Sequence, residues 1–129
     1  MALDNYFTGI QHVGIPAGNL DETKAFYEKL GFELAGEFMY NDARCAFMKY
    51  GNLMIETWEG DKIADVDGAI NHISLNTTDA DAALKEAKAM GLNLIDTEIQ
   101  TRPFWEKGIR FFNIYGPNHE KIEFCEIVK

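Results

Sequence analysis

The chain has 129 residues, of which 47% are hydrophobic, and its formal net charge is −9. This length suits a single domain, residues 1–129, with an ordinary hydrophobic core. The acidic balance argues against nucleic acid or an anionic membrane surface as a partner, because both bind clustered Lys and Arg. The sequence has no secretion signal and no apolar run of about 18 residues, so we expect a cytoplasmic protein with reduced cysteines.

In chain order, the first half predicts a strand, a helix and three further strands. Residues 9–15 alternate as a half-buried strand does, and residues 21–30 place their apolar side chains on one stripe of a helix. Turn-forming residues then separate three more runs of strand character. These strands are predicted over 33–40, 44–50 and 53–58.

The second half predicts the same order of elements with one longer connection. A strand, a helix and three strands are expected over 70–76, 79–90, 92–98, 108–115 and 120–127. The repeat halves therefore cover about 8–59 and 69–127, joined by a polar linker. Residues 99–108 are an insertion that the first half lacks, and we expect a loop there. The whole pattern is α+β, with βαβββ taken twice.

The most informative feature is a histidine and a glutamate that recur at matching points of the two halves. His12 and His72 lie in similar apolar strands, 60 residues apart. Glu56 and Glu123 each lie in the closing strand of a half, 67 residues apart because of the insertion. Strand alternation turns these side chains away from the apolar residues that pack under the helices. Four groups from four strands would then converge on the concave face of a curled sheet.

Two imidazoles and two carboxylates form a mixed set of nitrogen and oxygen donors. Such a set suits one divalent transition ion per site, Zn, Ni, Co, Mn or Fe, and needs no thiolate. An octahedral ion with four protein ligands keeps two positions for a chelating substrate. That arrangement favours stabilisation of an enediolate and proton transfer by a carboxylate, which is isomerase or epimerase chemistry. The alternative is a relic cup, in which the four polar residues hydrogen-bond without a metal.

A second group of residues is a weaker candidate for contact with a small-molecule substrate. Trp58 shares a strand face with Glu56, but an aromatic side chain there is as typical of core packing. The insertion carries aromatic and cationic side chains that suit either a lid or a solvated loop. An arginine on a strand suits either an anionic substrate group or an outer-face ion pair. The candidate substrate contacts are Trp58, Arg102, Phe104, Trp105 and Arg110.

Four segments of the chain carry a resemblance to a known family. They are Ile10-Gln11-His12-Val13, Phe26-Tyr27-Glu28-Lys29-Leu30-Gly31-Phe32, Asn71-His72-Ile73 and Gly116-Pro117-Asn118-His119-Glu120-Lys121-Ile122-Glu123. Over residues 9–127 the chain resembles the vicinal oxygen chelate superfamily, which includes glyoxalase I, methylmalonyl-CoA epimerase, extradiol dioxygenases, fosfomycin-resistance transferases and bleomycin-binding proteins. The resemblance implies a glyoxalase-like fold with a curled mixed sheet, helices on the outside, a concave metal-binding cup and, commonly, a homodimer.

The set His12, Glu56, His72 and Glu123 resembles the metal ligands of glyoxalase I. The resemblance implies that Glu123 is also the mobile base, with Glu56 across the ion. Glutathione-dependent members have an arginine where this chain has Ile15-Pro16-Ala17, which argues against glutathione as a co-substrate. We therefore expect a lactoylglutathione lyase-like isomerase, epimerase or lyase that acts on a small hydroxy-carbonyl compound.

Two other functions fit the same fold. One is a non-catalytic protein that binds an aromatic compound or a bleomycin-type antibiotic in the cup, which tight binding without metal would identify. The other is a metal-dependent transferase that modifies an antibiotic, which dependence on an added thiol or dioxygen would identify.

Overall fold

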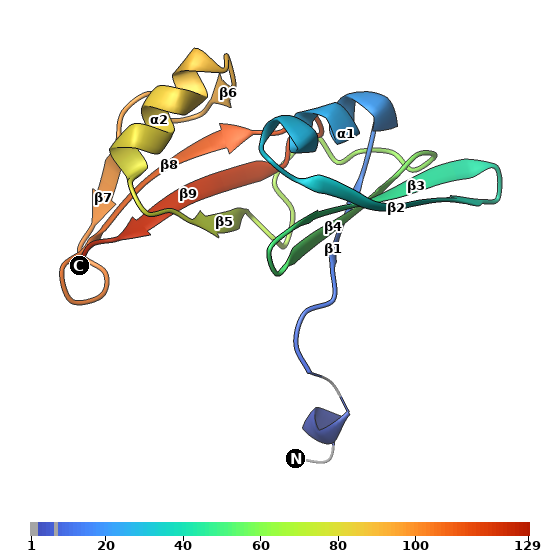
Figure 1. Cartoon of the computed structure of the whole chain (residues 1–129), viewed down its shortest axis with the longest axis horizontal. Coiled ribbons are helices and arrows are strands. Elements are labelled where there is room, and N and C mark those ends of the chain that lie inside the picture. Colours follow the sequence, from blue (N-terminus) through green and yellow to red (C-terminus); the bar gives the residue numbers. More distant parts are fainter. Residues whose placement is uncertain (1–2, 7) are drawn as a thin grey trace. The chain divides into compact units, whose positions relative to one another are not determined.

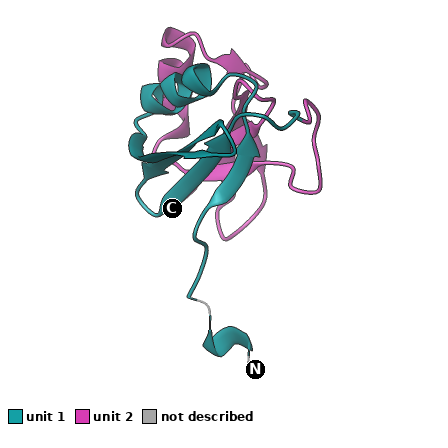
Figure 2. Ribbon diagram, turned by 90° about the vertical axis from the view of Figure 1, so that its right-hand side faces the viewer, with its two compact units in different colours: residues 1–63 teal, residues 64–129 magenta. Residues whose placement is uncertain are grey.

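The computed structural model describes residues 3–6 and 8–129, and the chain divides into two compact units, residues 1–63 and 64–129 (Figures 1 and 2). Each unit contains one α-helix and one mixed sheet. The first unit also begins with a short 3-10 helix, η1 (Leu3–Asn5), which the sequence pattern does not predict. The expected α+β class with two repeated halves is confirmed.

The first unit forms a four-stranded sheet covered by one helix. Its elements are β1 (Val13–Pro16), α1 (Leu20–Lys29), β2 (Glu33–Tyr40), β3 (Ala43–Tyr50) and β4 (Leu53–Trp58). The strand order is β1-β4-β3-β2, in which β1 runs parallel to β4 and the other neighbours are antiparallel. The first strand of the unit therefore lies beside the last.

The second unit repeats this arrangement. Its elements are β5 (Ile73–Asn76), α2 (Ala80–Ala89), β6 (Asn93–Leu94), β7 (Gln100–Arg102), β8 (Ile109–Tyr115) and β9 (Lys121–Ile127). The strand order is β5-β9-β8-β6, with β7 also paired to β8. As in the first unit, the first strand runs parallel to the last, β5 to β9.

Both helices begin and end with the same local chemistry. The side chains of Asn19 and Asp79 each accept a hydrogen bond from the backbone N–H three residues further on, at 2.9 and 3.0 Å. These contacts satisfy N–H groups that the first helical turn leaves unpaired. After each helix the chain turns through a glycine with positive φ, Gly31 at +105° and Gly91 at +68°, a conformation that costs glycine little.

The helices cover one face of each sheet and leave the other face to polar residues. In β4, Ile55 and Thr57 are buried, whereas Glu56 between them is half-buried. In β9, Ile122 is buried and the neighbouring Glu123 is half-buried. This alternation confirms the predicted orientation of the two glutamates, which lie on the faces opposite to the helix-covered ones.

One predicted strand is interrupted. Residues 92–98 do not form a continuous strand, since β6 ends at Leu94 and the N–H groups of Ile95 and Asp96 both donate to the carbonyl of Asn113. Regular pairing to β8 resumes at β7, within the insertion that was expected to be a loop. The Asp96 carboxylate accepts hydrogen bonds from the backbone N–H and the side-chain amide of Asn113, at 2.8 and 2.9 Å. A side chain thus binds the N–H of Asn113, a group that normally donates to a strand carbonyl.

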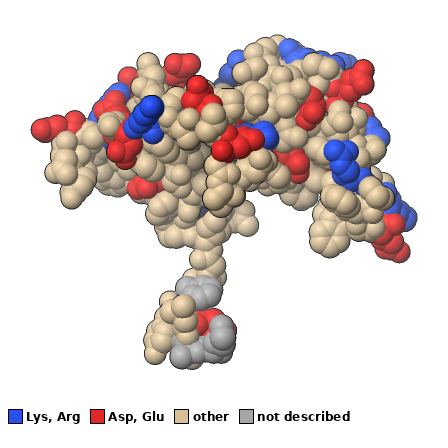
Figure 3. All heavy atoms as spheres, turned by 180° about the vertical axis from the view of Figure 1, so that it is seen from behind, with Lys and Arg blue, Asp and Glu red and all other residues tan. Residues whose placement is uncertain are grey.

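The face of the molecule drawn in Figure 3 carries charges of both signs. On the face drawn in Figure 3, Lys and Arg side chains are interspersed with Asp and Glu. Among the described residues, no helix is long and apolar enough to span a membrane.

Candidate metal centre

Strand register places each candidate glutamate at the same point of its unit. The parallel pairing of β1 with β4 puts Gly14 opposite Glu56, and that of β5 with β9 puts Ser74 opposite Glu123. Gly14 and Ser74 each come two residues after a candidate histidine. The histidines themselves, predicted within strands, immediately precede β1 and β5 instead.

Each unit brings one histidine close to one glutamate. His12 Nε2 lies 3.5 Å from Glu56 Oε1, and His72 Nε2 lies 3.8 Å from Glu123 Oε2. The two histidine side chains are 37% and 40% exposed, so their rings are open to a ligand. Each unit therefore places its own candidate histidine beside its own candidate glutamate.

A side-chain amide precedes each histidine and contacts its other ring nitrogen. The Gln11 side-chain oxygen contacts His12 Nδ1, and Asn71 Oδ1 lies 2.9 Å from His72 Nδ1. The Asn71 amide nitrogen donates to Asp67 at 3.1 Å, which orients its oxygen toward the ring. Because an amide oxygen only accepts, each contact assigns the proton to Nδ1 and leaves a lone pair on Nε2. That is the tautomer in which a histidine binds a metal through Nε2.

These two amides are positioning residues that the sequence analysis did not single out. The signal was present, because Gln11 and Asn71 occupy the same place in the repeated motif. Both residues carry a side-chain amide, but the role of that amide is apparent only from its contact with the histidine ring in the structure. They hold the imidazoles in the orientation that turns Nε2 toward the glutamates.

Both glutamates also neighbour a thiol. Cys45 Sγ donates to Glu56 Oε2 at 3.6 Å, and the Cys125 thiol lies near enough to Glu123 for that carboxylate to raise its pKa. Burial, followed by the charge of the adjacent carboxylate, raises the pKa of both thiols. Both cysteines are free, as expected. The thiols therefore act as neutral donors to the carboxylates.

The donor chemistry of the two pairs fits a divalent transition ion, because each offers an unprotonated imidazole nitrogen beside a carboxylate. Among the described residues, no group of three or more His, Cys, Asp or Glu side chains could hold a metal ion. Each unit thus supplies two donors. Convergence of His12, Glu56, His72 and Glu123 on one ion concerns both units and stays a prediction.

Aromatic side chains surround the pair in the first unit. A Cβ atom added at Gly14 would lie 3.2 Å from the Trp58 ring, so the glycine admits the indole beside Glu56. Trp58 Nε1 donates to Asp61 at 2.7 Å, which fixes the ring. On the other side, Phe47 pairs with Glu56 and stands edge-on to the His12 ring at 5.8 Å. The predicted place of Trp58, on the same face as Glu56, agrees with this packing.

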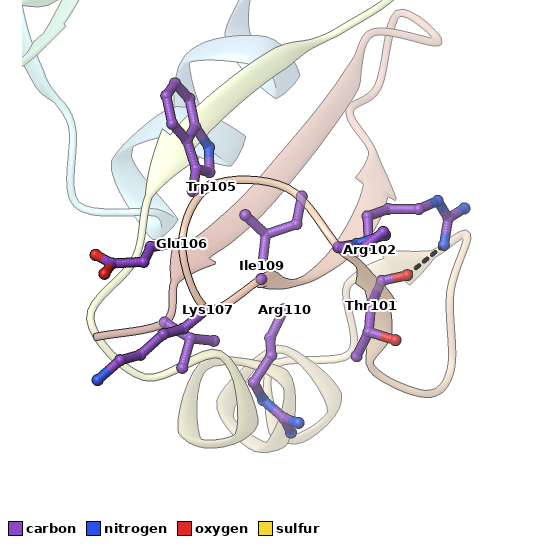
Figure 4. Close-up of a pocket in the computed structure, with 10 residues that line it drawn as sticks. Thr101, Arg102, Trp105, Glu106, Lys107, Ile109 and Arg110 are labelled. Atoms are coloured by element: carbon purple, nitrogen blue, oxygen red, sulfur yellow. Dashed lines mark hydrogen bonds between the residues drawn. The ribbon is translucent and has the colours of Figure 1, made fainter.

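The insertion in the second unit forms a surface pocket of about 710 Å³ (Figure 4). Trp105 lines this pocket and is 73% exposed, whereas its neighbour Phe104 is 54% exposed and is not among the lining residues. Arg102 donates to the carbonyl of Thr101 at 2.7 Å and covers the Phe111 ring. In Figure 4 the cationic ends of Arg102, Lys107 and Arg110 point in different directions.

This pocket lies at the far end of the strands from Glu123. Ile109 in the pocket pairs with Ile127, whereas Asn113 pairs with Glu123, four residues along β9. That separation is about 13 Å along the strand. Contact between a substrate at Glu123 and the insertion residues Arg102, Phe104 and Trp105 stays a prediction.

Arg110 forms an outer-face ion pair, which is one of the two roles that the sequence predicts for it. Its place in β8 is three residues from Asn113, so it lies on the opposite face to Glu123. Its guanidinium donates to both oxygens of Asp81 at the start of α2, at 2.7 and 2.8 Å. The outer-face ion pair, rather than a substrate contact beside Glu123, is what this geometry provides.

The first unit carries the same ion pair at the equivalent place. Arg44, the second residue of β3, donates to Asp21, the second residue of α1, and also to Glu59. Hydrogen bonds from Arg44 lower the pKa of both Asp21 and Glu59. The Arg–Asp ion pair thus recurs in both units on the helix-covered face, away from the His–Glu pairs. We therefore interpret it as a structural contact between strand and helix.

Two βαβββ units, each with a His–Glu pair on the face away from its helix, define a class of proteins built from repeated modules. The chain belongs to the Glyoxalase/Bleomycin resistance protein/Dioxygenase superfamily, whose model matches residues 9–124. This confirms the family inferred from the repeated motifs.

Solved structures support the fold. A glyoxalase family protein from Enterococcus faecalis is 22% identical, with a TM-score of 0.76 over 94% of this chain and 99% of that one. The fosfomycin resistance protein FosX from Listeria monocytogenes, complexed with Mn(II) and a sulfate ion, is 19% identical, with a TM-score of 0.70 over 95% and 94%. No curated protein sequence matches this chain.

Proposed function

We propose that this protein is a metal-dependent isomerase, epimerase or lyase that moves a proton between adjacent carbons of a small hydroxy-carbonyl substrate. The observation that carries the proposal is the duplicated His–Glu pair, in which an amide contact leaves Nε2 of His12 and of His72 free for a ligand. A hydrogen-bonded relic cup would not require the same tautomer in both units.

The proposed ligands of one divalent ion are His12, Glu56, His72 and Glu123. The two pairs come together either within one chain or between two copies in a homodimer. Zn, Ni, Co, Mn and Fe all suit two imidazoles and two carboxylates. When bound, such an ion polarises a carbonyl oxygen and stabilises the negative charge that develops as a proton leaves the neighbouring carbon.

The residues of this chain supply the remaining parts of the reaction. Gln11 and Asn71 orient the imidazoles, and a glutamate accepts the proton from one carbon and returns it to the next. Phe47 and Trp58 form an apolar wall beside Glu56 that limits access of water. Glutathione is not part of this proposal, because the arginine that glutathione-dependent members have after the first histidine is replaced here by Ile15-Pro16-Ala17.

The first experiment measures the metal content of protein purified without chelator or affinity metal. We expect one divalent ion per set of four ligands, and loss of that ion in both His12→Ala and His72→Ala. Asn76→Ala is the matched control, because Asn76 lies on β5 on the same face as Ser74 and outside the His–Glu pair. Wild-type protein that takes up no metal on reconstitution would contradict the proposal.

A second candidate function is non-catalytic binding of an aromatic ligand. It is favoured by exposed aromatic side chains on β2, where Phe38 and Tyr40 are 60% and 77% exposed. Titration of metal-free protein with planar aromatic compounds, followed by the fluorescence of its two tryptophans, Trp58 and Trp105, tests it. Binding that is equally tight with and without metal would favour this function over the enzyme.

A further inference from the structure

The two candidate glutamates are held differently, and the difference follows from strand register. Ser74 stands opposite Glu123, and its hydroxyl donates a hydrogen bond of 2.9 Å to Glu123 Oε1. Gly14 stands opposite Glu56 at the equivalent place and has no side chain to donate. Ser74 is the only serine in the chain.

The neighbours on the next strand do not change this contrast. Asn113 on β8 is the register partner of Glu123, and Phe47 on β3 is that of Glu56. The Asn113 amide donates to Asp96, and a phenylalanine side chain has no donor. The Glu123 side chain is also the more enclosed of the two, 15% exposed against 28% for Glu56.

The thiols do not remove this difference, because each glutamate has one and a thiol is a weak donor. In the part of the chain that the structure describes, the Cys45 thiol is the only hydrogen-bond donor to Glu56. Glu123 has the Ser74 hydroxyl in addition. Glu56 is therefore the carboxylate with fewer restraints on rotation.

The Ser74 bond also leaves the correct oxygen of Glu123 available. Ser74 occupies Oε1, while Oε2 is the oxygen that lies beside His72 Nε2. A carboxylate that binds a metal through one oxygen is commonly held by a hydrogen bond to the other. This arrangement suits Glu123 as a ligand that stays on the ion.

We infer that Ser74 is a positioning residue that makes Glu123 the permanent carboxylate ligand, and that Glu56 is the carboxylate that leaves the ion to carry the proton. The inference rests on the proposed function and assigns the mobile role to the other glutamate from the one that the family resemblance implies. Glu56 takes the proton from the carbon that bears the hydroxyl group, and the electron pair of the broken C–H bond stays on the substrate. Glu56 then returns the proton to the adjacent carbonyl carbon, while the hydroxyl proton passes to the former carbonyl oxygen. No oxidant, reductant or co-reactant is consumed.

The test measures binding of Mn(II) alone, by electron paramagnetic resonance, so that no substrate is needed. We expect Glu123→Gln to weaken Mn(II) binding at least about tenfold more than Glu56→Gln does. Ser74→Ala is expected to weaken it by about tenfold or more, the loss typical of removing a group that orients a metal ligand. Ser74→Thr keeps the hydroxyl and Asn76→Ala lies outside the contact, so both should stay within about threefold of wild type.

Circular dichroism of each variant establishes that it is folded, which the exposure of Ser74 and Asn76 favours. Equal losses of affinity in Glu56→Gln and Glu123→Gln, or wild-type affinity in Ser74→Ala, would overturn this inference and leave the proposed function standing. A wild-type protein that binds neither Mn(II) nor Zn(II) would overturn both. The two failures are therefore distinguishable in one set of titrations.

Discussion

The two units share their structural parts and differ in what surrounds their glutamates. Both have a capped helix that is followed by a glycine, and both have an arginine on a strand paired to an aspartate at the start of the helix. Each glutamate has a cysteine nearby, but the cross-strand partners of the two glutamates are not shared. Glu123 lies between Ser74 and Asn113, whereas Glu56 lies between Gly14 and Phe47.

The shared and the differing residues serve different purposes, namely the stability of each unit and the separate tasks of the two glutamates. Caps and ion pairs serve the stability of each unit, so the same solution works twice. Two carboxylates with identical surroundings would behave alike, whereas binding an ion and moving a proton ask for different restraints. Four expected outcomes follow, beginning with the largest effect.

The largest expected effect is on turnover in Glu56→Gln. Removal of a group that transfers a proton typically lowers the rate by about 10²–10⁴-fold. We expect a loss of this size with metal binding largely kept, measured as exchange of substrate carbon-bound hydrogen in D₂O over a panel of hydroxy-carbonyl compounds. Glu123→Gln, in contrast, should lose turnover together with its metal. Full turnover in Glu56→Gln would remove the distinction between the two units.

Metal binding should stabilise the protein through both units at once. A ligand at about one hundred times its dissociation constant raises the free energy of unfolding by about 2.7 kcal/mol. We expect an increase of this size with Mn(II) in wild type, measured by urea denaturation, and its loss in His12→Ala and in His72→Ala alike. Loss in only one of the two variants would mean that each pair acts alone.

The helix caps should contribute equally in the two units. Replacing a capping Asn or Asp with alanine typically costs about 1 kcal/mol. Asn19→Ala and Asp79→Ala are each expected to lower the free energy of unfolding by this amount, measured by urea denaturation, while leaving Mn(II) affinity unchanged. A change in Mn(II) affinity in either variant would show that the shared and the differing parts are coupled.

The smallest effect concerns the Arg44 cluster in the first unit. Arg44 lowers the folded-state pKa of Asp21 and Glu59, so its contribution is present above their unfolded values and is lost as pH falls through the lowered ones. Arg44→Met should therefore be less stable than wild type at pH 7, and the difference should shrink toward pH 3. Asp21 is exposed and Arg44 and Glu59 are half-buried, so solvent screening should keep the difference at pH 7 below that of a helix cap. A gap that widens in acid would contradict this linkage.

Local patterns predicted most of the fold. Strands over 33–40 and 53–58 agree with β2 and β4 at both ends, because alternation and turn residues are local signals. The interrupted strand at 92–98 was predicted wrongly, since its break depends on a hydrogen bond between Asp96 and Asn113, residues far apart in the sequence. The same applies to Arg110, whose partner lies on α2.

The sequence by itself determined the repeat, the family and the four candidate ligands, because identical residue types at matching points of two halves are visible without coordinates. Only the tertiary structure decided which residues accompany them. Parallel pairing of the first and last strands of each unit sets Ser74 beside Glu123 and Gly14 beside Glu56. Hydrogen bonds between such distant residues depend on register, and register is a property of the folded sheet rather than of either strand alone.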